Sequence, residues 1–234
     1  MFVINFKFSM LFVSFIILSL NLRSQTTVTD VSGNIYKTVK IGNQIWMAEN
    51  LRTEKFRNGD PIEQITSNRY WQEISLFSMS DTTLEEIYPA MCFSNNTKGR
   101  DNALYNWYTV IDSREICPMG WHVPSSNEFQ DLIDYLGGIE YANAKLKSIT
   151  SWENNGNNLS GFNAKPIGTR TGDGYFGGAS EYAGFWTDTY GGERNKYNNM
   201  LIPGACSIFL ENDQIKRSCI SIYNCAASVR CIKN

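Results

Sequence analysis

The stretch CPMGWHVPSSNEFQDLIDYLGG, residues 117–138, contains the start, the buried face and the end of a helix. Ser125 and Glu128 form an S-x-x-E capping box, in which the serine hydroxyl accepts from the Glu128 N–H and the carboxylate accepts from the Ser125 N–H. Apolar side chains then recur at helical spacing, at Phe129, Leu132, Ile133 and Leu136. Gly137 and Gly138 follow and end the helix. The sequence therefore predicts a capped amphipathic helix here.

The same stretch raises the question of a Cys/His catalytic site, because Cys117 precedes His122, the only histidine of the chain. A catalytic cysteine needs a base within hydrogen-bond reach and a group that orients the base, which local sequence does not show. His122 lies between Trp121 and Val123-Pro124, where the chain enters the helix, a position typical of packing. We therefore interpret the motif as framework and Cys117 as a disulfide partner.

The N-terminus has the pattern of a secretory signal peptide. Lys7 is followed by an apolar run from Met10 to Leu20, and the small residue Ser24 marks the expected cleavage point. The alternative is a retained membrane anchor, but the apolar run has only about half of the roughly 20 residues that a spanning helix needs. We expect residues 1–24 to be removed and the mature chain to be secreted, periplasmic or held in the cell envelope without membrane insertion.

The remaining chain, residues 25–234, is expected to form a single domain. The full sequence has 21 basic and 23 acidic residues, which are interspersed without the basic stripe that nucleic acid requires as a partner. Aromatic residues make up 13% of the chain, and many lie in segments rich in Gly, Asn and Ser. This composition favours strands and long loops over a helical bundle.

Six cysteines follow the signal peptide, an even number that indicates disulfides in an exported protein. A zinc site is disfavoured, because the chain has no C-x2-C pair and one histidine cannot complete a Cys2His2 set. The residues alone leave the pairing open.

Periodicity predicts several further elements. Residues 34–41 form a strand with Ile35, Val39 and Ile41 on one face and Tyr36, Thr38 and Lys40 on the other, and Gly42-Asn43 turns it into a hairpin. Residues 103–112 are expected to form a helix with an apolar face of Leu104, Trp107, Tyr108 and Ile111. A short helix is expected at 141–148. Residues 55–102 are expected to form loops with one or two short strands, and residues 150–204 long loops between short strands. Strands are expected at 206–212 and 225–234, the second with Cys225, Ala227, Val229 and Cys231 on one face.

Several segments together resemble the Fibrobacter-type major paralogous (FISUMP) domain of exported and surface proteins in Bacteroidetes. They are VTDVSGNIYKTVKIGNQIWMAENL, ALYNWYTVIDSREICPMGWHVPSSNEFQDLIDYLGG, LSGFNAKPIGTR, GFWTDT and ASVRCIKN, in order from Val28 to Asn234. The resemblance implies an α+β domain similar to C-type lectin-like folds. Such a domain has two main helices, a twisted antiparallel sheet, long loops and neighbouring N- and C-terminal strands. It implies no established enzymatic activity.

The resemblance also implies a pairing of cysteines. Cys117 in ICPMGWHVP and Cys231 in SVRCIK match the characteristic cysteines of the family, which predicts a disulfide between them. Cys92 also matches a family position, whereas Cys206, Cys219 and Cys225 are additions of this chain. The sequence departs from the family pattern at FWTDT, where an aromatic-Trp-Ser-Ser-Thr run is usual, and at the Ala-Ala before SVRC, where Gly-Phe is usual.

Our first functional hypothesis is a non-enzymatic module that binds carbohydrate or a surface protein through the loops of residues 150–204. Aromatic faces stack on sugars, and Asn, Asp and Arg side chains supply oriented hydrogen bonds. The candidate contact residues are Trp152, Tyr175, Tyr190 and Arg194, whereas Trp186 is expected in the core. A calcium-dependent variant would use Asp173, Glu181, Asp188 and Glu193, but no calcium-loop or calcium-lectin signature occurs, so no metal or other cofactor is expected.

Two other classes stay open. An enzyme similar to the formylglycine-generating enzyme would need reactive cysteines, for which Cys219 and Cys225 are the close pair; a structural disulfide explains them equally well. No G-x-S-x-G, H-E-x-x-H or Walker motif occurs, so the common enzyme classes with such motifs are disfavoured. The third class is a structural or adhesive component of the envelope.

Overall fold

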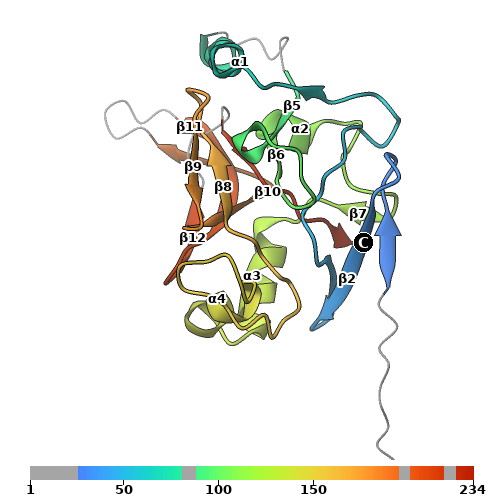
Figure 1. The fold of residues 1–234 in the computed structure, drawn as a ribbon, viewed down its shortest axis with the longest axis vertical. Helices are drawn as coiled ribbons and strands as arrows, with labels where there is room; N and C mark the ends of the chain where they lie inside the picture. The colour runs from blue at the N-terminus through green and yellow to red at the C-terminus, as the bar shows by residue number, and fades with distance from the viewer. Residues whose placement is uncertain (1–25, 81–87, 195–200, 219–224) are drawn as a thin grey trace, which may run out of the picture.

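The computed structural model describes residues 26–80, 88–194, 201–218 and 225–234 (Figure 1). The predicted signal peptide, residues 1–24, lies outside the described residues. Within the described parts of the chain, no helix combines the length and the apolar character needed to cross a membrane. The fold is a mixed α+β arrangement of two sheets and several helices.

The first sheet has five strands and brings the two ends of the described chain together. Its order is β1 (Thr27–Thr29), β2 (Ile35–Ile41), β3 (Gln44–Met47), β14 (Ile232–Lys233) and β7 (Trp121–His122), and all pairs are antiparallel. Ile232 pairs with Trp46 on one side and with His122 on the other. In Figure 1 this sheet lies on the right, beside the C-terminus. The predicted Gly42-Asn43 hairpin is confirmed, with Gly42 at φ 59°.

At the start of β2 the buried face is the one that carries Tyr36 and Thr38, whereas Ile35 is 55% exposed. The Tyr36 hydroxyl donates to Asp30 Oδ2 at 2.5 Å and accepts from the Arg52 N–H at 3.0 Å. The Arg52 guanidinium lies 4.4 Å from the centre of the tyrosine ring. These polar contacts allow a tyrosine to occupy the inner face.

The second sheet has the strand order β12-β11-β10-β8-β13-β6-β5-β4, and β9 pairs with β8. Its strands are β4 (Glu63–Gln64), β5 (Ala90–Phe93), β6 (Ala103–Asn106), β8 (Ile167–Arg170), β9 (Phe176–Ala179), β10 (Ala183–Arg194), β11 (Leu201–Leu210), β12 (Ile215–Ser218) and β13 (Ala226–Ala227). The prediction of long loops with short strands at 150–204 is therefore wrong for its second half, because β10 has 12 residues. Backbone pairing between β10 and β11 stabilises this segment despite its many glycines.

Four helices occur in the described residues: α1 (Asn68–Ser80), α2 (Trp107–Ile111), α3 (Ser126–Tyr135) and α4 (Ile139–Leu146), with a 3-10 turn at Ser94–Asn96. In Figure 1, α1 lies at the top of the molecule, and α3 and α4 lie at the bottom. The sequence prediction of two main helices and a short helix at 141–148 is therefore confirmed for α3 and α4, and in part for α2. It missed α1 because the segment has no sustained apolar period; the buried Trp71 and Ile74 nevertheless anchor the helix.

The predicted helix at 103–112 is only half correct. Residues Ala103–Asn106 pair as β6, and the helix begins after Asn106, whose Oδ1 accepts from the Thr109 N–H at 3.0 Å. The cap therefore shortens the helix to its second half. Leu104 is buried within the strand, and Ile111 is 40% exposed.

The capping box and its helix are confirmed. Ser125 Oγ accepts from the Glu128 N–H at 3.2 Å, and the Ser125 N–H donates to Glu128 Oε2 at 2.7 Å. The predicted apolar face is buried at Phe129, Leu132, Ile133 and Leu136. Gly137 and Gly138, at φ 99° and 85°, end the helix as predicted.

The described residues form three apolar clusters, and both cysteines of the predicted disulfide belong to the largest of them. Cys117 and Cys231 are bonded, with Cα atoms 6.0 Å apart and 114 residues between them in sequence. The bond joins the segment before β7 to the segment before β14. Ala227, Val229 and Cys231 contact the same cluster, with Cys225 packed against it, as their expected common face implied.

Candidate functional site

A polar cavity of about 420 Å³ lies where the loop between β5 and β6 meets the start of β8 and the end of β9. We call it the polar pocket. Residues with hydroxyl, amide, ammonium and carboxylate side chains line it together with three aliphatic residues. The lining residues are Ser94, Asn95, Thr97, Asp101, Asn102, Ser151, Lys165, Pro166, Ile167, Ala179 and Ser180.

The first wall is the loop of residues 94–102. The Ser94 N–H donates to the Asn102 carbonyl at 2.8 Å and closes the loop. Asn96 Nδ2 donates to the Thr66 carbonyl at 3.0 Å. Within the described residues, Asn102 Oδ1 is buried without a hydrogen-bond donor. An unpaired buried acceptor costs about 1–3 kcal/mol, which a ligand donor reaching it would recover.

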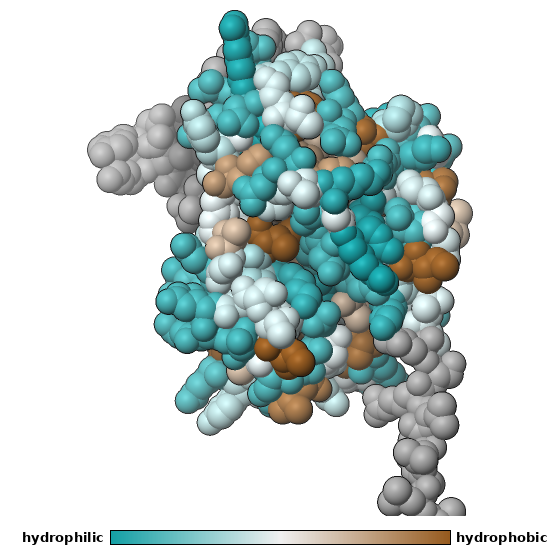
Figure 2. All heavy atoms as spheres, in the orientation of Figure 1, coloured by the Kyte–Doolittle hydropathy of each residue, from teal (hydrophilic) through white to brown (hydrophobic). Residues whose placement is uncertain are grey.

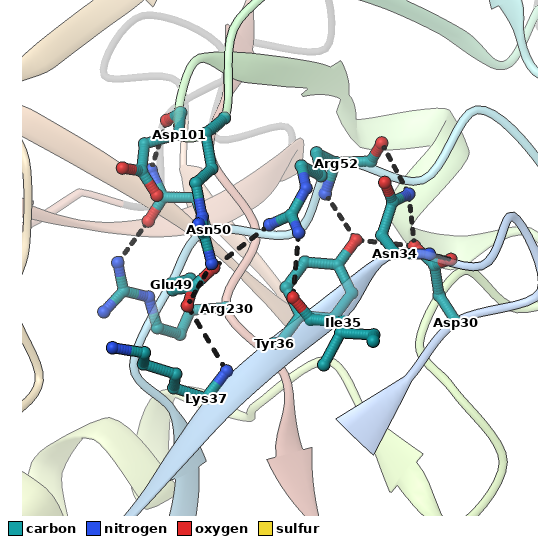
Figure 3. Close-up of polar contacts among 11 residues, drawn as sticks. Asp30, Asn34, Ile35, Tyr36, Lys37, Glu49, Asn50, Arg52, Asp101 and Arg230 are labelled. Atoms are coloured by element: carbon teal, nitrogen blue, oxygen red, sulfur yellow. Dashed lines mark hydrogen bonds and ion pairs between the residues drawn. The ribbon is translucent and has the colours of Figure 1, made fainter. Parts of the chain in front are cut away.

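A network beneath this wall fixes the loop to the core (Figure 3). The buried carboxylate of Glu49 accepts two hydrogen bonds from Arg100, at 3.0 Å each, and one from Arg52 at 3.2 Å. Asn50 Nδ2 donates to the Asp101 carbonyl at 3.0 Å. Loops held at several points stay in one conformation, so Arg100 and Asp101 are preorganised.

Arg230 is the innermost member of this network. Its guanidinium is buried, donates to Asn50 Oδ1 and to the Phe162 carbonyl, and lies 4.3 Å from the centre of the Phe162 ring. Burial lowers the pKa of Arg230 to about 9, although the negative charges of Asp101 and Glu49 act in the opposite direction. The Asp101 carboxylate therefore lies in the field of a buried positive charge.

The second wall belongs to the β8–β9 hairpin and the chain before it. Ser94 Oγ donates to the Ile167 carbonyl at 3.0 Å and joins the two walls. The Ser180 N–H donates to the Pro166 carbonyl at 2.9 Å, and Ile167 pairs with Ala179. Gly168 follows at φ 68°, where an added Cβ would lie 2.0 Å from the Gly177 carbonyl oxygen. Only glycine fits there, because the backbones of β8 and β9 lie close together at this position.

Three of the seven non-glycine residues with positive φ in the described chain line this cavity. Asn95, Ser151 and Ser180 have φ values of 53°, 78° and 70°, in the left-handed region. Asparagine tolerates this region, but it costs most residues about 1–2 kcal/mol, and such residues cluster at binding and catalytic sites. All three line the polar pocket, each from a different loop. The cavity is therefore the strongest candidate site.

The structure does not gather the four predicted contact residues at the polar pocket. Trp152 is 5% exposed, and its Nε1 donates to the Ala164 carbonyl at 3.0 Å, so its assignment as an exposed contact residue is corrected to a core residue. Tyr175 is 64% exposed in the turn between β8 and β9. Tyr190 is 56% exposed in β10, with its ring 5.6 Å from that of Trp107. Arg194 ends β10, paired with Leu201, and its side chain lies outside the described part.

Sequence reasoning missed the first wall and located the second only in part. Six lining residues, Ser151, Lys165, Pro166, Ile167, Ala179 and Ser180, lie in the predicted recognition segment 150–204. The run SNNTKGRDN at 94–102 carried a usable signal, since it combines adjacent asparagines with Gly and charged residues in a short loop.

A second cavity, of about 410 Å³, lies beside His122. His122 Nδ1 lies 2.6 Å from Asn234 Oδ1, and Nε2 lies 2.9 Å from Glu128 Oε1. A register shift between Trp186 and Tyr190 in β10 places Asp188 at the same cavity. Cys117 also borders it, but its sulfur is in the disulfide and cannot act as a nucleophile.

The charges around His122 influence one another. Burial opposes the charged form of His122, but hydrogen bonds to Asn234 and Glu128 outweigh it and raise the histidine pKa. Burial also opposes the charged form of Glu128, yet hydrogen bonds from Ser125 and His122 lower its pKa. Burial, with repulsion by Glu128, raises the pKa of Asp188. Among the described residues, no three His, Cys, Asp or Glu side chains are grouped to hold a metal ion.

No curated protein and no solved structure matches the chain. The model of one protein family, the Fibrobacter succinogenes major domain, matches residues 39–233. The match includes both sheets except β1 and the start of β2, all four helices, the disulfide and every residue that lines the polar pocket. The chain therefore belongs to the Fibrobacter succinogenes major domain family.

Proposed function

We propose that this chain is an exported, non-enzymatic binding module that recognises carbohydrate in the polar pocket. The observation that carries the proposal is the convergence of three strained loop residues, Asn95, Ser151 and Ser180, on one preorganised polar cavity. The cavity volume lies within the roughly 300–1,000 Å³ of small-molecule sites. Half of its wall comes from the segment 150–204 that the sequence favours for recognition.

The lining suits a sugar chemically. Hydroxyls of Ser151 and Ser180 can both donate and accept, as sugar hydroxyls do, and that of Ser94, which donates to the Ile167 carbonyl, can accept. The aliphatic area of Pro166, Ile167 and Ala179 offers a surface for the C–H face of a sugar ring. Figure 2 supports a polar ligand, because the apolar residues on the face shown form small separate areas among hydrophilic ones. A broad protein interface would favour a larger apolar patch.

The cysteines favour binding over catalysis. A reactive thiol is a thiolate with a lowered pKa. Burial raises the pKa of the free Cys225 thiol to about 11, and burial likewise raises that of Cys92 to about 11. Both are protonated at neutral pH, and Cys219 lies outside the described residues. An enzyme similar to the formylglycine-generating enzyme is therefore the weaker alternative.

Export and fold type belong to the same proposal. The Cys117–Cys231 bond supports an oxidising compartment, meaning the periplasm, the envelope or the medium. The pairing of β3 with β14, which joins the N- and C-terminal parts of the chain, supports the proposed similarity to C-type lectin-like folds. We propose that binding needs no calcium or other cofactor.

A bulky substitution tests the pocket without removing any polar group. Ala179 is exposed and lines the cavity, so Ala179→Trp fills it. The matched control is Ala144→Trp, on the exposed face of α4. A glycan array on the exported chain, with and without EDTA, should give the same positive glycans for the natural chain and the control, and at least tenfold weaker binding for Ala179→Trp.

The outcomes against the proposal are equally definite. Unchanged glycan binding by Ala179→Trp would place the site elsewhere. Loss of binding in EDTA would overturn the cofactor-free part. If no glycan binds and a pull-down from the cell envelope captures one protein partner, the adhesive alternative replaces the carbohydrate proposal.

A further inference from the structure

We propose that the polar pocket selects an acidic sugar, one whose carboxylate or sulfate group binds the Lys165 ammonium while its hydroxyls donate to the Asp101 carboxylate. This inference rests on the proposed carbohydrate function and adds the ligand class. It follows from the two charged side chains of the cavity, Lys165 and Asp101, and from the different surroundings of each.

Lys165 is a half-buried lysine whose ammonium group has no partner. Within the described residues it forms no ion pair and its Nζ forms no hydrogen bond, and the residue lines the cavity. The neighbouring lysines differ. Lys145 Nζ donates to the Leu136 carbonyl at 2.8 Å, and the buried Lys147 donates to the Asn212 carbonyl at 2.8 Å.

The comparison identifies Lys165 as the available cation. The ammonium groups of Lys145 and Lys147 each donate to a backbone carbonyl. The described part of the chain provides no such acceptor for Lys165. A cation in a concave polar site attracts an anion more strongly than an exposed lysine does, since the walls exclude part of the solvent.

Lys165 favours an anionic ligand, and the Asp101 carboxylate does not in turn require a cationic one. Its carbonyl is fixed by Asn50, and the buried Arg230 guanidinium acts on its charge through the same network (Figure 3). The buried positive charge thus offsets part of this negative charge from inside the protein. Within the described residues, Asp101 forms no ion pair, so its carboxylate oxygens are open to hydroxyl donors.

The pocket therefore holds one uncompensated cation and one partly compensated carboxylate. A neutral sugar would use Asp101 and the serine hydroxyls but leave Lys165 unpaired. An acidic sugar uses both. An ammonium is a point charge without the planar fork of arginine, so Lys165 does not itself distinguish a carboxylate from a sulfate.

The experiment compares three disaccharides of one linkage: neutral, hexuronate-containing and sulfated. Isothermal titration calorimetry on the natural chain should give at least tenfold tighter binding for one or both acidic disaccharides, and the two acidic arms identify which group is preferred. Raising the salt concentration should weaken acidic binding and leave neutral binding nearly unchanged.

Three variants test whether Lys165 causes the preference for acidic disaccharides. Lys165→Gln should lower acidic binding at least tenfold and leave neutral binding unchanged, whereas Lys165→Arg should retain the preference. Lys40→Gln, at an exposed lysine of β2, is the matched control and should behave as the natural chain does. Circular dichroism should show all three folded, because the Lys165 ammonium makes no contact whose loss would unfold the chain.

Two results would overturn the inference alone: equal affinity of the natural chain for neutral and acidic disaccharides, or an acidic preference that persists in Lys165→Gln. The absence of binding to all three disaccharides, and to the wider array, would instead overturn the proposed carbohydrate function on which the inference rests.

Discussion

Arg230 donates a hydrogen bond to the side-chain oxygen of Asn50, a residue 180 positions earlier in the chain. Asn50 in turn donates to the Asp101 carbonyl in the wall of the polar pocket. Both side chains are buried. The relationship means that a residue of the C-terminal segment determines the position of a loop near the middle of the sequence.

Asn50→Ala should destabilise the protein by about 2–4 kcal/mol, because it removes an acceptor from a buried guanidinium and a donor from the Asp101 carbonyl. Urea unfolding measures the change. Asn127→Ala, at an exposed position of α3, is the control and should change the free energy of unfolding by less than about 0.5 kcal/mol. Equal stability of the two variants would contradict the role of Asn50.

Trp152→Ala should cost about 3–5 kcal/mol, as expected for a buried aromatic residue. The side chain is 5% exposed, and Lys147 Nζ lies 4.6 Å from the centre of its ring. Tyr175→Ala removes an aromatic ring that is 64% exposed and should change stability by less than about 0.5 kcal/mol. Thermal unfolding of both variants checks the correction of Trp152 from contact residue to core residue; a stable Trp152→Ala would restore the original assignment.

Loss of the Cys117–Cys231 bond should lower the free energy of unfolding by about 4–5 kcal/mol, from the chain entropy of a loop of more than 100 residues. The double variant Cys117→Ala, Cys231→Ala isolates this bond, since Cys206 is also disulfide-bonded. Non-reducing peptide mapping of the natural chain should recover the two cysteines in one linked pair. Recovery of both as free thiols would contradict the structure.

Ser125→Ala should destabilise the protein by about 0.5–2 kcal/mol, the usual cost of losing an N-cap side chain. Ser125→Asp keeps an acceptor at the cap and should recover part of the loss. Sugar binding should persist in both variants, because the cap lies outside the polar pocket. Abolished binding with unchanged melting temperature would instead assign a recognition role to this segment.

The stability of the protein should decrease above about pH 6.5 through His122. A raised folded-state pKa means that the imidazolium contribution is complete below the unfolded value and is lost as the pH rises through the folded value. The pKa of Glu128 is lowered, so this carboxylate titrates below the window. Urea unfolding between pH 5.5 and 8.5 should show this loss in the natural chain and not in His122→Gln. Parallel curves for the two proteins would contradict the prediction.

The parts of the fold that the sequence predicted correctly depend on neighbouring residues. The capping box joins Ser125 to Glu128, and Gly42-Asn43 forms a turn through its own backbone preferences. Both interactions lie within a few positions, so the local pattern contains all the information needed. The pairing of Cys117 with Cys231 came instead from the family resemblance.

The parts that the local pattern did not predict depend on distant residues. Tyr36 is buried because Asp30 and Arg52 satisfy its hydroxyl, and α1 is held partly by the Arg170 guanidinium, 4.5 Å from the centre of the Trp71 ring. No periodicity within β2 or α1 encodes these partners. The polar pocket has the same origin, since Ser94, next to β5, and Ile167, in β8, meet only when the second sheet brings these strands together.

The position of β14 between β3 and β7 has a consequence for the order of folding. The first sheet remains incomplete until residues 232–233 have been synthesised, because Ile232 supplies the partner for both Trp46 and His122. Pairing over such sequence distances is slow, since the entropy of closing the loop is lost before the contacts form. Until β14 pairs, the facing edges of β3 and β7 lack their backbone partners. The last described strand therefore closes a sheet whose other strands come from much earlier in the chain.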